Sequence, residues 1–118
     1  MFFELVYDKS LAQASYVIGC QASGIAAVID PKRDVDTYLN IAKANNFKIT
    51  HILETHIHAD FLSGSRELAA LTGAEMYLSD EGDENWKYEF SSFFLSAINL
   101  HYLLDNAILL YVIFRKIL

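Results

Sequence analysis

Two short apolar runs separated by an amphipathic segment constrain the fold of this chain more than any other feature. Ile25 to Ile29 is wholly apolar, and Ile49 to Leu53 is apolar except for the enclosed Thr50 and His51. The segment between them predicts a helix that is capped by Asp34 or Asp36 and ends at Asn45-Asn46. Its expected apolar face is formed by Tyr38, Leu39, Ile41 and Ala42. A strand, a helix and a second apolar strand indicate a βαβ unit with a right-handed crossover.

Further strands and one further helix are expected around this unit. Residues 2–7 and 14–20 are rich in aromatic and β-branched residues and predict two strands that pair with the third as a meander. Residues 65–71 predict a short helix closed by Gly73, and residues 74–78 predict a fifth strand. The expected fold is therefore α/β (α+β), with a mixed sheet and its helices on one face.

Length, charge and cysteine content exclude several classes of function. The chain has 118 residues, 53% of them apolar, which suits one small domain with a real core. Its net charge of −6 argues against nucleic acid as a partner, because an acidic chain gains nothing from phosphate neutralisation. Cys20 is the only cysteine, so an internal disulfide is excluded. Glu4 and Asp8 interrupt any signal-like N-terminal run, and we expect a cytoplasmic protein.

The composition changes abruptly near Phe90. Residues 1–90 hold 14 acidic and 7 basic residues, whereas residues 91–118 hold only Asp105, Arg115 and Lys116 as fixed charges. We therefore divide the chain into a domain over 1–90 and an apolar, helical tail over 91–118. Residues 93–114 are long enough to span a membrane, but the central Asp105 offsets the gain from its apolar neighbours. A helix covering the sheet, or an aggregation-prone tail, is favoured over membrane association, and self-association stays open.

A histidine-rich loop follows the strand that ends at Leu53. His56, His58 and Asp60 are spaced two apart, so in extended backbone their side chains point the same way. Imidazole nitrogens and a carboxylate that converge suit zinc or ferrous iron, and the C-terminal end of a strand is where ligands bind in open α/β sheets. The three residues are therefore candidate metal ligands. The alternative is a merely solvated loop, and His51, on another register, is interpreted as a packing or surface residue.

The string from Glu54 to Gly64, ETHIHADFLSG, resembles the signature of the metallo-β-lactamase superfamily. It is most similar to the branch that contains glyoxalase II-type thioester hydrolases and persulfide dioxygenases, including members fused to rhodanese domains. Residues 16–19 (YVIG), 27–31 (AVIDP) and 73–75 (GAE) also match. The resemblance covers residues 1 to about 90. It implies the N-terminal half of an αββα sandwich, and a small thiol-derived, glutathione-like substrate.

The resemblance also implies roles for single residues. In binuclear hydrolases of the family the positions of His56 and His58 bind one metal, and the position of Asp60 binds a second together with a histidine directly after it. Here that next residue is Phe61, which cannot bind metal. In persulfide dioxygenases a single ferrous iron uses the position of His56, while those of His58 and Asp60 act beside it. The resemblance therefore favours Fe2+ and a sulfur dioxygenase, with Asp60 as the catalytic residue; Zn2+ and a hydrolase come next.

The family places further ligands, a histidine and an aspartate, in a second half of similar size. His101 and Asp105 do not match that pattern. The sequence therefore does not decide whether this chain is itself an enzyme. The alternative to a metalloenzyme is an inactive fragment that binds metal weakly or associates with membranes.

Overall fold

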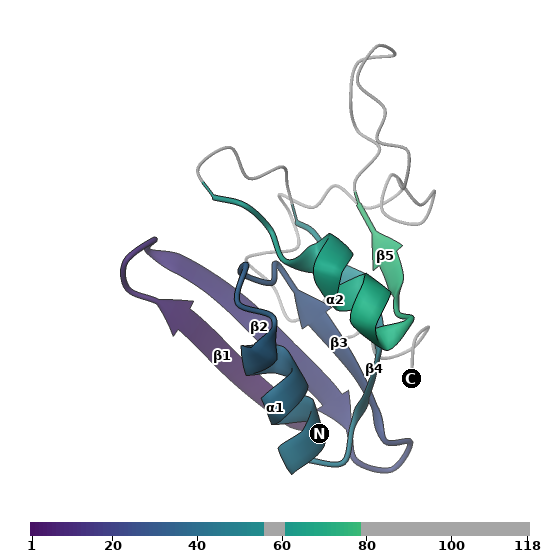
Figure 1. Ribbon diagram of the computed structural model, residues 1–118. Coiled ribbons are helices and arrows are strands. Elements are labelled where there is room, and N and C mark those ends of the chain that lie inside the picture. The colour runs from purple at the N-terminus through teal and green to yellow at the C-terminus, as the bar shows by residue number, and fades with distance from the viewer. Residues whose placement is uncertain (56–60, 79–118) are drawn as a thin grey trace.

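The computed structural model describes residues 1–55 and 61–78, which form a five-stranded mixed sheet and two helices (Figure 1). In chain order the elements are β1 (Phe2–Asp8), β2 (Gln13–Cys20), β3 (Ile25–Ile29), α1 (Asp36–Ala44), β4 (Lys48–Leu53), α2 (Ser65–Thr72) and β5 (Glu75–Tyr77). Strands β1, β2 and β3 pair antiparallel, and β3, β4 and β5 pair parallel. The predicted meander, the βαβ unit and the fold class are confirmed.

Several predicted features lie outside the described residues. They are the ligand candidates His56, His58 and Asp60, and the apolar tail over 91–118 with its segment 93–114. Within residues 1–55 and 61–78, neither helix has the length and apolarity needed to cross a membrane.

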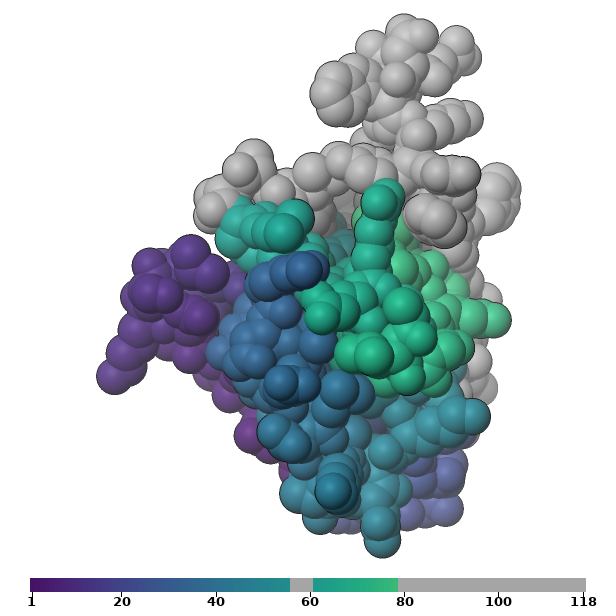
Figure 2. All heavy atoms as spheres, viewed as in Figure 1, coloured from purple at the N-terminus to yellow at the C-terminus, as the bar shows by residue number. Residues whose placement is uncertain are grey.

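Both helices pack against the same face of the sheet. Tyr38 and Ala42 of α1 and Leu68 of α2 are buried there against sheet residues such as Val28 and Ile52. Tyr38 and Ala42 are four apart and therefore share one face of α1, as the sequence predicts. Figure 2 shows the side chains of α1, in blue, and α2, in green, covering this face. This layer holds the main core.

The ends of the helices agree only in part with the sequence prediction. α2 ends at Gly73, whose φ of +71° is the left-handed conformation that glycine adopts readily, and its N–H donates to the Ala69 carbonyl at 2.8 Å. The predicted aspartate cap of α1 is wrong. Val35 is the N-cap, because the Asp34 carboxylate accepts a hydrogen bond from the Thr37 hydroxyl at 2.8 Å instead of from a helix N–H.

A β-bulge interrupts the pairing of β4 with β3. Ala26 faces Ile49 and Ala27 faces His51, so Thr50 has no partner residue on β3. The extra residue reverses the alternation of side chains beyond it. Ile49 and Ile52 therefore both lie in the helix-covered core, whereas Leu53 packs on the opposite face.

The opposite face of the sheet is also apolar. Ile18, Ala27, Ile29 and Leu53 form a second buried cluster there, with Tyr16 and Tyr77 beside it. On the edge strand β1 the side chains on this face are about half exposed: Phe3 50%, Leu5 52% and Tyr7 54%. The sheet thus has two apolar faces, and both described helices cover the same one.

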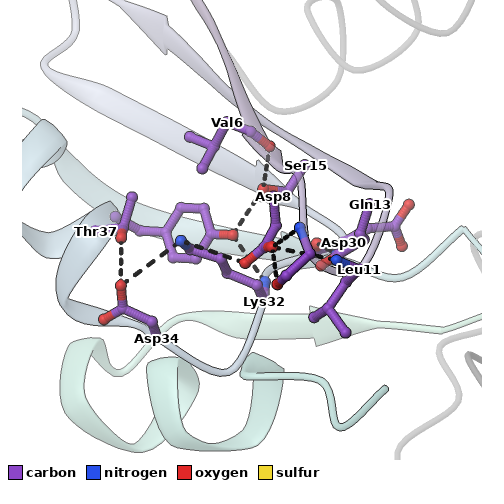
Figure 3. A network of polar contacts seen from close by, with 11 residues as sticks. Val6, Asp8, Leu11, Gln13, Ser15, Asp30, Lys32, Asp34 and Thr37 are labelled. Carbon is purple, nitrogen blue, oxygen red and sulfur yellow. Dashed lines mark hydrogen bonds and ion pairs between the residues drawn. The ribbon is translucent and has the colours of Figure 1, made fainter. Parts of the chain in front are cut away.

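A buried tyrosine ties α1 to the sheet. The Tyr38 hydroxyl lies 2.7 Å from Ser15 Oγ of β2 and accepts a hydrogen bond from the backbone N–H of Lys32 at 2.7 Å. The Ser15 hydroxyl also reaches the Val6 carbonyl of β1 at 3.2 Å (Figure 3). Burial raises the pKa of the Tyr38 phenol above its ordinary value. One hydroxyl therefore joins α1, β2 and the segment before α1.

Replacing Tyr38 by phenylalanine keeps the packing and removes only this hydroxyl. We expect the free energy of unfolding to fall by about 1–3 kcal/mol, because the Lys32 N–H loses its partner. Urea denaturation measures the change. Tyr7→Phe is the matched control, since the Tyr7 side chain is half exposed. Equal stability of the two variants would contradict this account.

His51 predicts a specific pH dependence of stability. Its ring stacks on Tyr77 with centroids 5.7 Å apart, and Nδ1 lies 2.7 Å from the Thr50 hydroxyl. Burial lowers the pKa of His51 below its ordinary 6.5, although Glu75 raises it somewhat. The unfolded chain therefore holds the proton more tightly than the folded chain, so the free energy of unfolding falls as the pH drops through 6.5.

The test compares wild type with His51→Gln by urea denaturation between about pH 7.5 and pH 5. We expect a shallower fall of the unfolding free energy in the variant, because glutamine does not titrate. The same slope in both proteins would contradict this account of His51.

Candidate functional site

The candidate site lies at the edge of the sheet where β3 and β4 end. Because these strands are parallel, Asp30, which follows β3, lies beside the end of β4. The Asp30 N–H donates to the Leu53 carbonyl at 2.8 Å. Asp30 has a φ of +49°, in the left-handed region that aspartate tolerates better than most residues. This conformation ends the strand and begins the turn toward α1.

The Asp30 carboxylate binds Thr55, the second residue after β4. Oδ1 accepts the backbone N–H of Thr55 at 2.7 Å, and Oδ2 accepts the Thr55 hydroxyl at 2.5 Å. Asp30 and Thr55 are both buried. Since one carboxylate satisfies two buried donors of one residue, the start of the histidine-rich segment is held in place.

Glu54 is the residue that directly follows β4, and it is buried at the same edge as Asp30. Its Oε1 accepts hydrogen bonds from the hydroxyls of Ser63 and Ser65, which lie beyond the histidine-rich segment. Its N–H donates to the Tyr77 carbonyl of β5 at 2.9 Å. Burial raises the pKa of the Glu54 carboxyl above its ordinary value; the two serine hydroxyls lower it, and the neighbouring Asp30 carboxylate raises it. Two carboxyl groups are thus buried side by side at this edge.

The turn between β1 and β2 borders the same edge. Gln13, which is buried, donates its side-chain N–H to the Asp30 carbonyl at 2.8 Å. The Lys32 ammonium lies 4.0 Å from the Asp8 carboxylate and 3.7 Å from that of Asp34 (Figure 3). The Asp30 backbone is therefore supported from β2 as well as from β4.

The predicted ligands His56, His58 and Asp60 lie outside the described residues, but the structure fixes both ends of the segment that carries them. Thr55 is bound by Asp30, and Ser63 is bound by Glu54. Within residues 1–55 and 61–78, no three His, Cys, Asp or Glu side chains gather closely enough to hold a metal ion. Two imidazoles and a carboxylate on a short segment between fixed ends fit a zinc or iron ion in kind.

Sequence reasoning did not assign a site role to Asp30, Glu54, Ser63 or Ser65. The signal available was the position of Asp30 and Glu54, each directly after an apolar run. The side chain of Glu54 reaches the serines only because the bulge at Thr50 turns it toward the helix-covered face. That reversal is not visible in the alternation of the sequence.

The sequence pattern of the metallo-beta-lactamase superfamily matches residues 10–116, which is most of the chain. This chain belongs to the metallo-beta-lactamase superfamily. Among curated relatives, a hydroxyacylglutathione hydrolase of Rhodospirillum rubrum is 43% identical over 61 residues, 52% of this chain and 23% of that protein. Another, from Pelagibacter ubique, is 34% identical over 71 residues, 60% of this chain and 29% of that protein. The chain thus spans about a quarter of the length of such relatives.

Solved structures of the superfamily share the fold. A metallo-beta-lactamase from Staphylococcus aureus superposes with a TM-score of 0.72 at 49% identity, over 78% of this chain and 27% of that one. ETHE1 from Myxococcus xanthus superposes with a TM-score of 0.67 at 32% identity, over 71% of this chain and 38% of that one. The predicted family resemblance and its restriction to the N-terminal part of such proteins are confirmed.

Gly64 allows the chain to pass close to the segment that follows β3. Its N–H donates to the Pro31 carbonyl at 3.0 Å, and a Cβ placed on it would collide with the Lys32 carbonyl and approach Val35 Cγ1 at 2.8 Å. We expect Gly64→Ala to lower the free energy of unfolding by about 1–3 kcal/mol, because backbone must shift to make room.

Thermal denaturation measures this effect, and Gly73→Ala is its contrast. A Cβ at Gly73 meets no atom within 4 Å, so that variant reports only the cost of a positive φ. If Gly64→Ala left the melting temperature unchanged, the close approach at Pro31 and Lys32 would be wrong.

Proposed function

We propose that this chain carries the first metal ligands of a metal-dependent enzyme that acts on glutathione-derived sulfur compounds. His56 and His58 would supply imidazole nitrogens and Asp60 a carboxylate, as the spacing of the motif suggests. One observation carries the proposal. In this chain, a member of the superfamily, the motif begins at Thr55, and the Asp30 carboxylate holds Thr55 at the edge of the sheet. We place this chemistry in the cytoplasm, which suits the unpaired Cys20.

Persulfide oxidation by a sulfur dioxygenase is the favoured reaction. Phe61 stands where the binuclear hydrolases of the family have a further metal-binding histidine, which favours a single metal ion, and ferrous iron over zinc. Iron would supply oxygen chemistry, and zinc would supply a Lewis acid that lowers the pKa of water. His56 would bind the ion, while His58 and Asp60 would act beside it, the Asp60 carboxylate taking up or releasing a proton near the substrate sulfur.

Thioester hydrolysis is the second candidate. Its support is the 43% identity between this chain and the hydroxyacylglutathione hydrolase of Rhodospirillum rubrum over 61 aligned residues. Under this alternative His56 and His58 would bind zinc and Asp60 would bind a second ion. The two reactions are distinguished by oxygen consumption with glutathione persulfide and by thiol release from a hydroxyacylglutathione.

Metal content tests the proposed site directly. We expect chain purified without chelators to hold about one equivalent of iron by mass spectrometry, and His56→Ala to hold much less, because the variant lacks the imidazole that binds the ion in both candidate schemes. His51→Gln is the matched control, since His51 stacks on Tyr77 and lies outside the motif.

Iron that is lost only in His56→Ala supports the proposal, and zinc in its place would favour the hydrolase. Equal metal in all three proteins, or none in the wild type, would overturn the site.

A further inference from the structure

Glu54, Ser63 and Ser65 form a hydrogen-bonded group, here named the Glu–Ser clamp, that joins the two ends of the histidine-rich segment. Glu54 precedes Thr55, and its Oε1 accepts from the hydroxyls of both serines. Glu54 is 6% exposed and Ser65 is 2% exposed. The clamp is thus a three-way contact, buried at Glu54 and Ser65 and half-buried at Ser63, across the eight residues between Glu54 and Ser63.

The serine side of the clamp is itself fixed to the chain after β3. The Ser65 N–H donates to Ser63 Oγ at 3.1 Å, and Ser63 Oγ lies 3.4 Å from the Pro31 carbonyl. Ser65 is the first residue of α2, so its position follows the helix. The clamp therefore connects β4, α2 and the turn after Asp30 at one point.

Such a connection holds Glu54 and Ser63, which stand on either side of the histidine-rich segment, in contact. A loop whose two ends are fixed close together has fewer conformations than one whose ends move with separate elements. Groups that hold metal-binding residues in position affect metal affinity although they do not touch the ion. The contact between Glu54 and the serines depends on the bulge at Thr50. Without that extra residue, the alternation of side chains along β4 would point Glu54 away from α2.

We propose that the Glu–Ser clamp is a positioning device that presents His56, and in the hydrolase alternative also His58, to the metal ion. The inference rests on the proposed metal site and adds three residues that are not among the candidate ligands. Ser63 and Ser65 act through Glu54, and none of the three binds metal.

The first test is the affinity of the full chain for Zn2+ and Co2+, measured by competition with a chromophoric chelator. We expect Ser65→Ala and Ser63→Ala to bind roughly 10- to 100-fold more weakly than wild type. Ser63→Thr keeps the hydroxyl at a half-buried position and should restore the affinity. Ser15→Ala is the matched control: Ser15 is 1% exposed and bonded to Tyr38, so the variant loses a buried, hydrogen-bonded hydroxyl that does not bond the clamp.

The second test needs no metal. Amide hydrogen exchange at Thr55 should accelerate in Ser65→Ala, because the clamp couples the two ends of the segment, and should not change in Ser15→Ala. A serine that merely stabilised the start of α2 would leave Thr55 unaffected.

The outcomes separate the two proposals. Wild type that binds neither ion overturns the proposed metal site. Wild type that binds metal, with Ser65→Ala indistinguishable from Ser15→Ala in affinity and in exchange at Thr55, overturns the positioning role alone.

Discussion

The site edge depends on the contact between the Asp30 carboxylate and Thr55. Asp30 ends β3 in a left-handed conformation, and Thr55 follows the end of β4, so this contact ties together the two strands that the α1 crossover separates in sequence. The contact satisfies the backbone and the side-chain donor of Thr55 at a buried position, and an unsatisfied buried donor is among the costlier defects in a protein interior. Two further contacts hold the backbone at the same place. The Gln13 side chain donates to the Asp30 carbonyl, and the Gly64 N–H donates to the carbonyl of the next residue, Pro31.

The bulge at Thr50 determines which face of the sheet each side chain in the second half of β4 points to. With strict alternation from Ile49, residue 52 would point away from the helices; with one residue inserted, Ile52 enters the main core beside Leu68. Glu54 then lies on the side of α2, within reach of Ser65. A local irregularity in a strand thus has its main effect four residues later, at the site, which is where bulges are commonly found.

Much of the fold follows from the sequence because its signals are local. Apolar runs, the face of α1 shared by Tyr38 and Ala42, and the stop at Gly73 each depend on neighbours within a few residues. The cap of α1 was mispredicted because Asp34 bonds the Thr37 hydroxyl, a choice between two nearby donors that spacing does not decide.

The polar contacts of the site depend on distant partners. Asp30 and Thr55 are separated by 25 residues and Glu54 and Ser65 by 11, and both contacts depend on how β4 is paired with its neighbour. A single sequence shows that such residues are polar and follow apolar strands, but not which of them meet. The spacing of the sequence predicts the candidate ligands, whereas the groups that hold the ends of their segment follow only from the sheet register.

The order of the strands in the sheet has a consequence for how the chain is made. The spatial order β1-β2-β3-β4-β5 is the order of synthesis, so each strand pairs with the one that precedes it. As the chain leaves the ribosome, the strand that each new strand pairs with has already been made. None of the five described strands has to be inserted between two others. Domains generally fold as units during synthesis, beginning at the N-terminus. The described sheet can therefore grow by addition at one edge.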